Sequence, residues 1–82
     1  MKISLCYDKL TGKLINAEKF KNDSQIDVPD KCAVRDLLSL LETPGNRRGA
    51  ITVYINDEPA WNSTILKEGD SAKLLISIGG GG

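Results

Sequence analysis

The sequence of 82 residues predicts an α+β fold, in which a mixed sheet of four to five strands carries one helix on one face. Residues 2–7, 51–56 and 72–78 alternate polar and apolar side chains, which is the period of a half-buried strand. Residues 31–42 instead have the apolar spacing of an amphipathic helix. Because so short a chain can build only one small core, we expect a single domain over residues 1–78.

The first predicted strand is residues 2–7 (KISLCY), which places Ile3, Leu5 and Tyr7 on one side. Residues 8–13 follow as a turn, because the aspartate and the glycine in this segment are turn formers. One face of this strand is therefore expected to be buried.

A return strand is predicted within residues 14–28, and Pro29 ends it because proline has no donor for the ladder. Asp30 is the expected cap of the helix in residues 31–42. Four apolar residues of this segment follow the i, i+3, i+4, i+7 spacing: Val34, Leu37, Leu38 and Leu41. A proline and a glycine then end the helix, and residues 45–50 are expected to form a loop.

The strand at residues 51–56 (ITVYIN) is predicted to point Thr52 and Tyr54 outward. Its inward side chains are Ile51, Val53 and Ile55. Trp61 lies in the turn-rich segment that follows and is expected to cap the core, as large aromatic residues usually do.

Gly69 is expected to take the positive φ of a tight turn before the last strand. That strand, residues 72–78, places alternate side chains on two faces. One face carries Leu74, Ile76 and Ile78, and the other carries Lys73, Leu75 and Ser77. The sequence then ends in four glycines, which we expect to be a flexible tail, because glycine loses the most backbone freedom on ordering.

Composition excludes several classes of function. Eleven Lys and Arg residues balance eleven Asp and Glu residues, which argues against a general binder of nucleic acid or of anionic membranes. No apolar run approaches the length of a membrane span, and the first residues lack the apolar core of a signal peptide. We therefore expect a cytoplasmic protein.

Cys6 and Cys32 are the only cysteines, and the sequence has no histidine. These are too few soft ligands for a zinc or iron–sulfur site, so we expect no metal. A cysteine nucleophile would also lack a histidine base, so we expect no enzyme active site. Two buried or half-buried thiols are the expected state, and a single disulfide between them stays open.

The predicted order is strand, strand, helix, strand, irregular segment, strand. This order suits a ubiquitin-like β-grasp fold. Ferredoxin-like splits and other small α+β folds remain open on the pattern alone.

Several segments together resemble the sulfur-carrier proteins of thiamine and molybdopterin biosynthesis, the ThiS/MoaD-like family. They are the helix AVRDLLSLL, the strand and turn VYINDEP, the segment LKEGDSAKLL and the glycine end. The resemblance covers most of the chain from residue 33 onward and is weakest over residues 8–30. The chain departs from the family in its four final glycines and in having no proline near them.

The resemblance implies a carrier that does not itself catalyse a reaction. A partner adenylyltransferase of the ubiquitin-activating type would use ATP to adenylate the carboxylate of Gly82, and sulfur would replace AMP to give a thiocarboxylate. Gly79, Gly80 and Gly81 would thread the narrow active site of that partner, where a Cβ would obstruct passage. A downstream synthase would accept the sulfur. No cofactor is bound by the carrier, which is expected to be a monomer on its own.

The outward sheet face is the expected docking surface for that partner. Leu75 and Tyr54 are apolar where the alternation predicts water, and the resemblance implies that an apolar residue at the Leu75 position docks on the activating enzyme. Lys73, Arg47 and Arg48 are expected to steer the encounter with an acidic surface, although such arginines are more often merely solvated. Cys6 is expected to share this face.

Two other functions stay open. The chain is alternatively a ubiquitin-like modifier, with Gly82 joined to lysines of other proteins, or a plain β-grasp interaction domain. Which biosynthetic pathway it serves, molybdopterin or thiamine or another thiolation, depends on partner enzymes.

Overall fold

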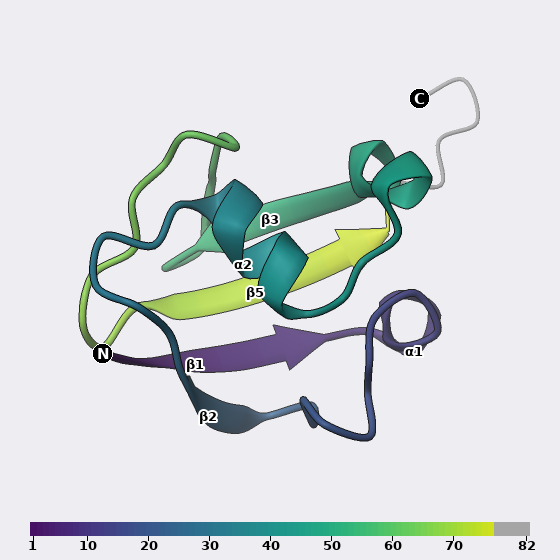
Figure 1. The fold of residues 1–82 in the computed structure, drawn as a ribbon, viewed down its shortest axis with the longest axis horizontal. Coiled ribbons are helices and arrows are strands. Elements are labelled where there is room, and N and C mark those ends of the chain that lie inside the picture. The colour runs from purple at the N-terminus through teal and green to yellow at the C-terminus, as the bar shows by residue number, and fades with distance from the viewer. Residues whose placement is uncertain (77–82) are drawn as a thin grey trace.

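The computed structural model describes residues 1–76, without the side chains of residues 46–48. It contains one five-stranded mixed sheet and short helices (Figure 1). The elements in chain order are β1 (Lys2–Tyr7), α1 (Lys9–Gly12), β2 (Ser24–Asp27), α2 (Val34–Leu40), the 3-10 helix η1 (Gly45–Ala50), β3 (Ile51–Ile55), β4 (Glu58–Pro59) and β5 (Ser71–Ile76). The predicted order of strands around one amphipathic helix is confirmed.

The sheet has the strand order β2-β1-β5-β3-β4, so the last strand lies at its centre. β5 pairs in parallel with β1, where Leu5 is opposite Ala72. It pairs in antiparallel fashion with β3, where Val53 is opposite Leu74. Antiparallel pairs with β2 and β4 complete the two edges.

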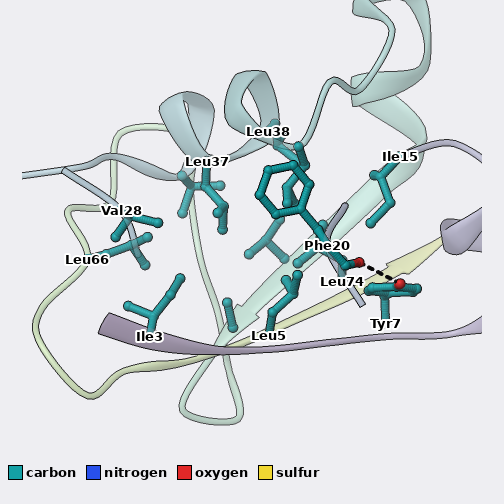
Figure 2. Packing of buried hydrophobic residues seen from close by; sticks show 14 of the residues in the cluster. Ile3, Leu5, Tyr7, Ile15, Phe20, Val28, Leu37, Leu38, Leu66 and Leu74 are labelled. Carbon is teal, nitrogen blue, oxygen red and sulfur yellow. Dashed lines mark hydrogen bonds between the residues drawn. The ribbon is translucent and has the colours of Figure 1, made fainter. Parts of the chain in front are cut away.

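The core lies between α2 and one face of the sheet (Figures 1 and 2). The four apolar positions of the helix, Val34, Leu37, Leu38 and Leu41, are at most 2% exposed. The predicted inward residues of β1 are likewise buried, and so is Leu74 of β5. The sequence therefore predicted correctly which of these side chains of α2, β1 and β5 face the core.

The start of α2 differs from the prediction. Ala33 precedes the helix, and its N–H donates to the Asp36 carboxylate at 3.0 Å. Asp30 is not the cap and lies 3.6 Å from the amino group of Met1. The end of the helix is a Schellman turn, in which Thr43 N–H donates to the Leu38 carbonyl at 3.1 Å.

The segment between β1 and β2 closes one end of the core. It contains the single turn of α1, which Asp8 caps by accepting from Thr11 N–H at 2.8 Å. The Tyr7 hydroxyl donates to the buried Phe20 carbonyl at 2.7 Å (Figure 2). Tyr7 N–H also donates to the side-chain oxygen of Asn22 at 2.8 Å. Two hydrogen bonds from one residue thus attach this segment to the sheet.

Trp61 was predicted to cap the core, and this prediction is wrong: its side chain is 79% exposed. The segment that carries it is nevertheless held by backbone hydrogen bonds to the start of α2, such as Val34 N–H to the Thr64 carbonyl at 2.9 Å. Leu66, from the same segment, is 2% exposed and belongs to the core. Gly69 has a φ of 85°, as predicted for its turn.

Residues 45–50 form a 3-10 helix where a loop was predicted. The described part of β5 ends at Ile76, so the predicted continuation to Ile78 and the tail at residues 79–82 lie outside the described residues. Within residues 1–76, we find no helix of the length and apolarity that a bilayer crossing requires.

Candidate functional site

The outer face of the sheet, opposite α2, brings together three of the residues that the sequence singled out. Tyr54 of β3 lies directly opposite Lys73 of β5. Leu75 is two residues further along β5 and is paired with Thr52. Because alternate residues of a strand share one face, Tyr54, Lys73 and Leu75 form a contiguous surface. Tyr54 and Leu75 are half-buried and Lys73 is exposed.

A shallow depression of about 220 Å³ lies at this place, lined by Tyr54, Lys73, Leu75 and Asp57. We call these four residues the docking depression. Tyr54 and Leu75 give it apolar surface, and Asp57 and Lys73 supply opposite charges. Neither charged side chain forms an ion pair within residues 1–76, so both remain available to a partner.

Asp57 is the member of the docking depression that the sequence reasoning missed. It lies in the two-residue turn between β3 and β4, where Asn56 and Asp57 have φ values of 53° and 68°. Two positive φ values are the mark of a type I′ hairpin turn, which favours asparagine and aspartate. The Asn–Asp pair after a clearly predicted strand was therefore a usable signal for the turn that carries Asp57.

Comparison with known proteins gave matches of structure alone. No protein-family model and no curated protein matches the sequence. A protein provisionally assigned as molybdopterin converting factor subunit 1 from Pyrococcus furiosus superposes with a TM-score of 0.70 at 16% identity, over 93% of this chain and 97% of that one. The small archaeal modifier SAMP1 from Haloferax volcanii gives a TM-score of 0.69 at 16% identity, over 98% and 99%. One chain from the complex of subunits 1 and 2 of molybdopterin-converting factor from Helicobacter pylori gives a TM-score of 0.60 at 19% identity, over 98% of this chain and 99% of that one.

The chain has the ubiquitin-like β-grasp fold. The shared fold extends over nearly the whole chain, including residues 8–30, where the sequence resemblance was weakest. The structures found are named as molybdopterin converting factor and small modifier proteins, so the resemblance to the ThiS/MoaD-like family is confirmed at the level of the fold.

Cys6 lies beside Lys73 on the outer face of the β-grasp sheet and is half-buried, as predicted. Burial raises the pKa of the Cys6 thiol, and the nearby Asp23 carboxylate raises it further. The pKa of the Cys32 thiol is raised by burial and then by Asp36. Both cysteines are free, which confirms the expected thiols and leaves no disulfide. At neutral pH both are protonated and therefore poor nucleophiles.

The other predicted site residues of the β-grasp chain are not tested. Arg47 and Arg48 belong to η1, but their side chains are outside the described part of the structure. Gly79, Gly80, Gly81 and Gly82 lie beyond the described residues, with Gly82 six positions after Ile76 in the sequence. Among residues 1–76, no group of three or more acidic, cysteine or histidine side chains is arranged to hold a metal ion.

Proposed function

We propose that this protein is a sulfur carrier whose Gly82 carboxylate is activated by a partner enzyme. The observation that carries the proposal is the close structural match to molybdopterin converting factor subunit 1 over nearly the full length of both chains. The glycine end of the sequence supports it, and so does the docking depression, to which β5 contributes Lys73 and Leu75. The matching structures are named as molybdopterin converting factor subunit 1 and a small archaeal modifier, which supports a role in which a partner supplies the chemistry.

The proposed reaction begins when a Gly82 carboxylate oxygen attacks the α-phosphate of ATP and releases pyrophosphate. A hydrosulfide-level donor then attacks the acyl carbon, the bond to AMP breaks, and a thiocarboxylate remains. Glycine suits this end because a residue without a Cβ can enter a narrow cleft.

The docking depression would receive the activating enzyme. A partner side chain inserted between Tyr54 and Leu75 would lose its contact with water, and aromatic and leucine anchors of this kind dominate many interfaces. Lys73 and Asp57 would then set orientation and association rate more than affinity. The Helicobacter pylori structure is a complex of subunits 1 and 2, which supports a protein partner in general.

A ubiquitin-like modifier is the second candidate, because the small archaeal modifier of Haloferax volcanii matches equally well. In that case, the amine of a lysine on another protein would displace AMP from the Gly82 acyl group to form an isopeptide bond. Two free thiols suit a reducing compartment under either function.

Intact mass spectrometry of the protein from its own cells separates these candidates. Replacement of one oxygen of the terminal carboxylate by sulfur supports the carrier. A ladder of covalent conjugates supports the modifier. Deletion of Gly81 and Gly82 should abolish either function without loss of folding, whereas unchanged function would favour a plain interaction domain.

Leu75→Asp tests the docking depression, with Ile65→Asp as its matched control. Both side chains are apolar and at least partly accessible, but Ile65 lies outside the depression. In an ATP–pyrophosphate exchange assay with the activating enzyme from the same genome, Leu75→Asp should raise KM about tenfold or more, and Ile65→Asp should leave it unchanged. A folded Leu75→Asp variant with normal KM would contradict the docking role.

A further inference from the structure

Two short helices lie at the end of the sheet where the described part of β5 finishes. β1 and β5 are parallel, with Tyr7 opposite Leu74, so α1, which follows β1, lies beside the end of β5 and packs against it (Figure 1). β3 begins with Ile51 opposite Ile76, so η1, which precedes β3, lies at the same end. Because Gly82 follows Ile76 in the sequence, a partner that binds the chain beyond Ile76 meets this end of the fold.

α1 presents an apolar side chain together with two lysines at this end. Leu10 is 43% exposed, and Lys9 and Lys13 are exposed as well. Lys13 directly follows α1 and keeps helical backbone angles, so it is one turn from Lys9 and three residues from Leu10. Residues at these spacings are neighbours on a helix surface. We call Lys9, Leu10 and Lys13 the α1 surface.

The backbone that carries the α1 surface is fixed to the fold. Asp8 accepts from Thr11 N–H at 2.8 Å and, through its carbonyl, from Gly12 N–H at 3.0 Å. Leu14 N–H donates to the Thr11 carbonyl at 2.8 Å, and the Thr11 side chain is fully buried. The turn is therefore already ordered before a partner binds, so little entropy is lost in ordering it.

The charges at this end favour an acidic partner. Residues 8–23 and 42–50, which connect the strands there, contain six basic and four acidic residues in a chain that has eleven of each. Two of the acidic residues are already engaged, since Asp8 caps α1 and the Glu42 carboxylate lies 3.9 Å from Lys19 Nζ. The lysines of the α1 surface form no ion pair within residues 1–76, and like charges one helical turn apart repel each other. The sequence of η1 adds Arg47 and Arg48 to the same end.

We propose that the α1 surface is a second contact for the activating enzyme, which offers it an acidic surface with an apolar recess for Leu10. This inference rests on the proposed function. The docking depression is on the outer face of the sheet, whereas α1 belongs to the segment that closes one end of the core. Two separated contacts fix the orientation of the carrier better than one contact does, so Gly82 is brought to the same place in each encounter.

ATP–pyrophosphate exchange with the activating enzyme from the same genome tests this contact on the full chain. Lys9→Glu together with Lys13→Glu should raise KM about tenfold at about 50 mM salt, and much less at about 0.5 M salt, because salt screens exposed charges. Leu10→Ala should raise KM about fivefold. The kcat should stay unchanged for both variants, because neither substitution touches the reacting atoms.

Two matched controls separate the position of a substitution from its type. Lys31→Glu together with Lys67→Glu changes the net charge by the same amount at exposed lysines outside residues 8–23 and 42–50. Ile65→Ala shortens an exposed aliphatic side chain outside the same segments. Both controls should leave KM within about twofold of the unsubstituted value.

Three results would overturn the inference. The first is a normal KM for α1-surface variants that urea unfolding shows to be folded, while Leu75→Asp still raises KM; this result leaves the proposed function standing. The second is an equal rise in KM for the Lys31 and Lys67 variant, because net charge and not the α1 surface would then be responsible. The third is an absence of exchange with the unsubstituted protein, which would overturn the proposed function as well.

Discussion

Tyr7→Phe should destabilise the protein measurably, because it removes one oxygen atom from a buried hydrogen bond. The Tyr7 hydroxyl donates to the Phe20 carbonyl at 2.7 Å, and the Tyr7 side chain is 8% exposed. Loss of the donor leaves a buried carbonyl without this partner, which costs about 1–3 kcal/mol. For a domain of this size each kcal/mol lowers the melting temperature by roughly 4–8 °C, so we expect a fall of at least about 4 °C.

Tyr54→Phe is the matched control. The same oxygen is removed there, but the Tyr54 hydroxyl makes no hydrogen bond within residues 1–76 and its side chain is half-buried on the outer face. We expect a change within about 0.5 kcal/mol. Calorimetry and urea unfolding of both variants measure the difference. Equal stability of the two variants would mean that the bond to Phe20 does not hold the segment between β1 and β2.

Three further predictions concern the backbone and the thiols. Gly69→Ala should cost about 1 kcal/mol in urea unfolding, because Gly69 has a φ of 85°, and a wild-type midpoint would contradict that strain. Gly12→Ala should unfold at lower urea concentration than Gly45→Ala, because its Cβ would lie 3.0 Å from the Tyr7 ring, which the hydrogen bond to Phe20 holds in place, whereas a Cβ at Gly45 meets nothing within 4 Å. Because the pKa of Cys32 is raised in the folded protein, the unfolded chain loses its thiol proton at a lower pH than the folded chain does. The contribution of Cys32 to the free energy of unfolding should therefore be fully present below about pH 8.5 and be lost above it. Urea unfolding between about pH 7 and 10 should show a smaller fall in the free energy of unfolding for Cys32→Ala than for the unsubstituted protein. An identical pH dependence of the two proteins would exclude this linkage.

The core and the outer face could be predicted because both depend on local spacing. Val34, Leu37 and Leu38 repeat at the helical period, and the burial of all three follows from that period alone. Tyr54 and Leu75 were assigned to the outer face by alternation within their own strands. Their closeness, however, required the antiparallel register of β3 with β5, which a single sequence does not contain.

The wrong predictions concern residues whose surroundings come from distant parts of the chain. Trp61 was expected in the core, but hydrogen bonds from residues at the start of α2 fix its segment so that Leu66 is buried and Trp61 is not. Asp30 has the right residue type for a cap, yet the carboxylate that accepts from Ala33 N–H belongs to Asp36. In both cases the residue type was informative, but the pairing of segments decided the outcome.

The position of β5 between β1 and β3 has a consequence for synthesis of the protein. A nascent chain that has not yet produced residues 71–76 leaves both neighbouring strands with an open edge, and such edges invite aggregation. The sheet can close only when this stretch has left the ribosome, because its parallel pairing with β1 joins distant parts of the sequence. A prematurely terminated product that lacks residues 71–76 should therefore be degraded by proteases rather than act as a partly active domain. Conversely, a synthetic peptide with the sequence of β5 should rescue a fragment that ends before Ser71.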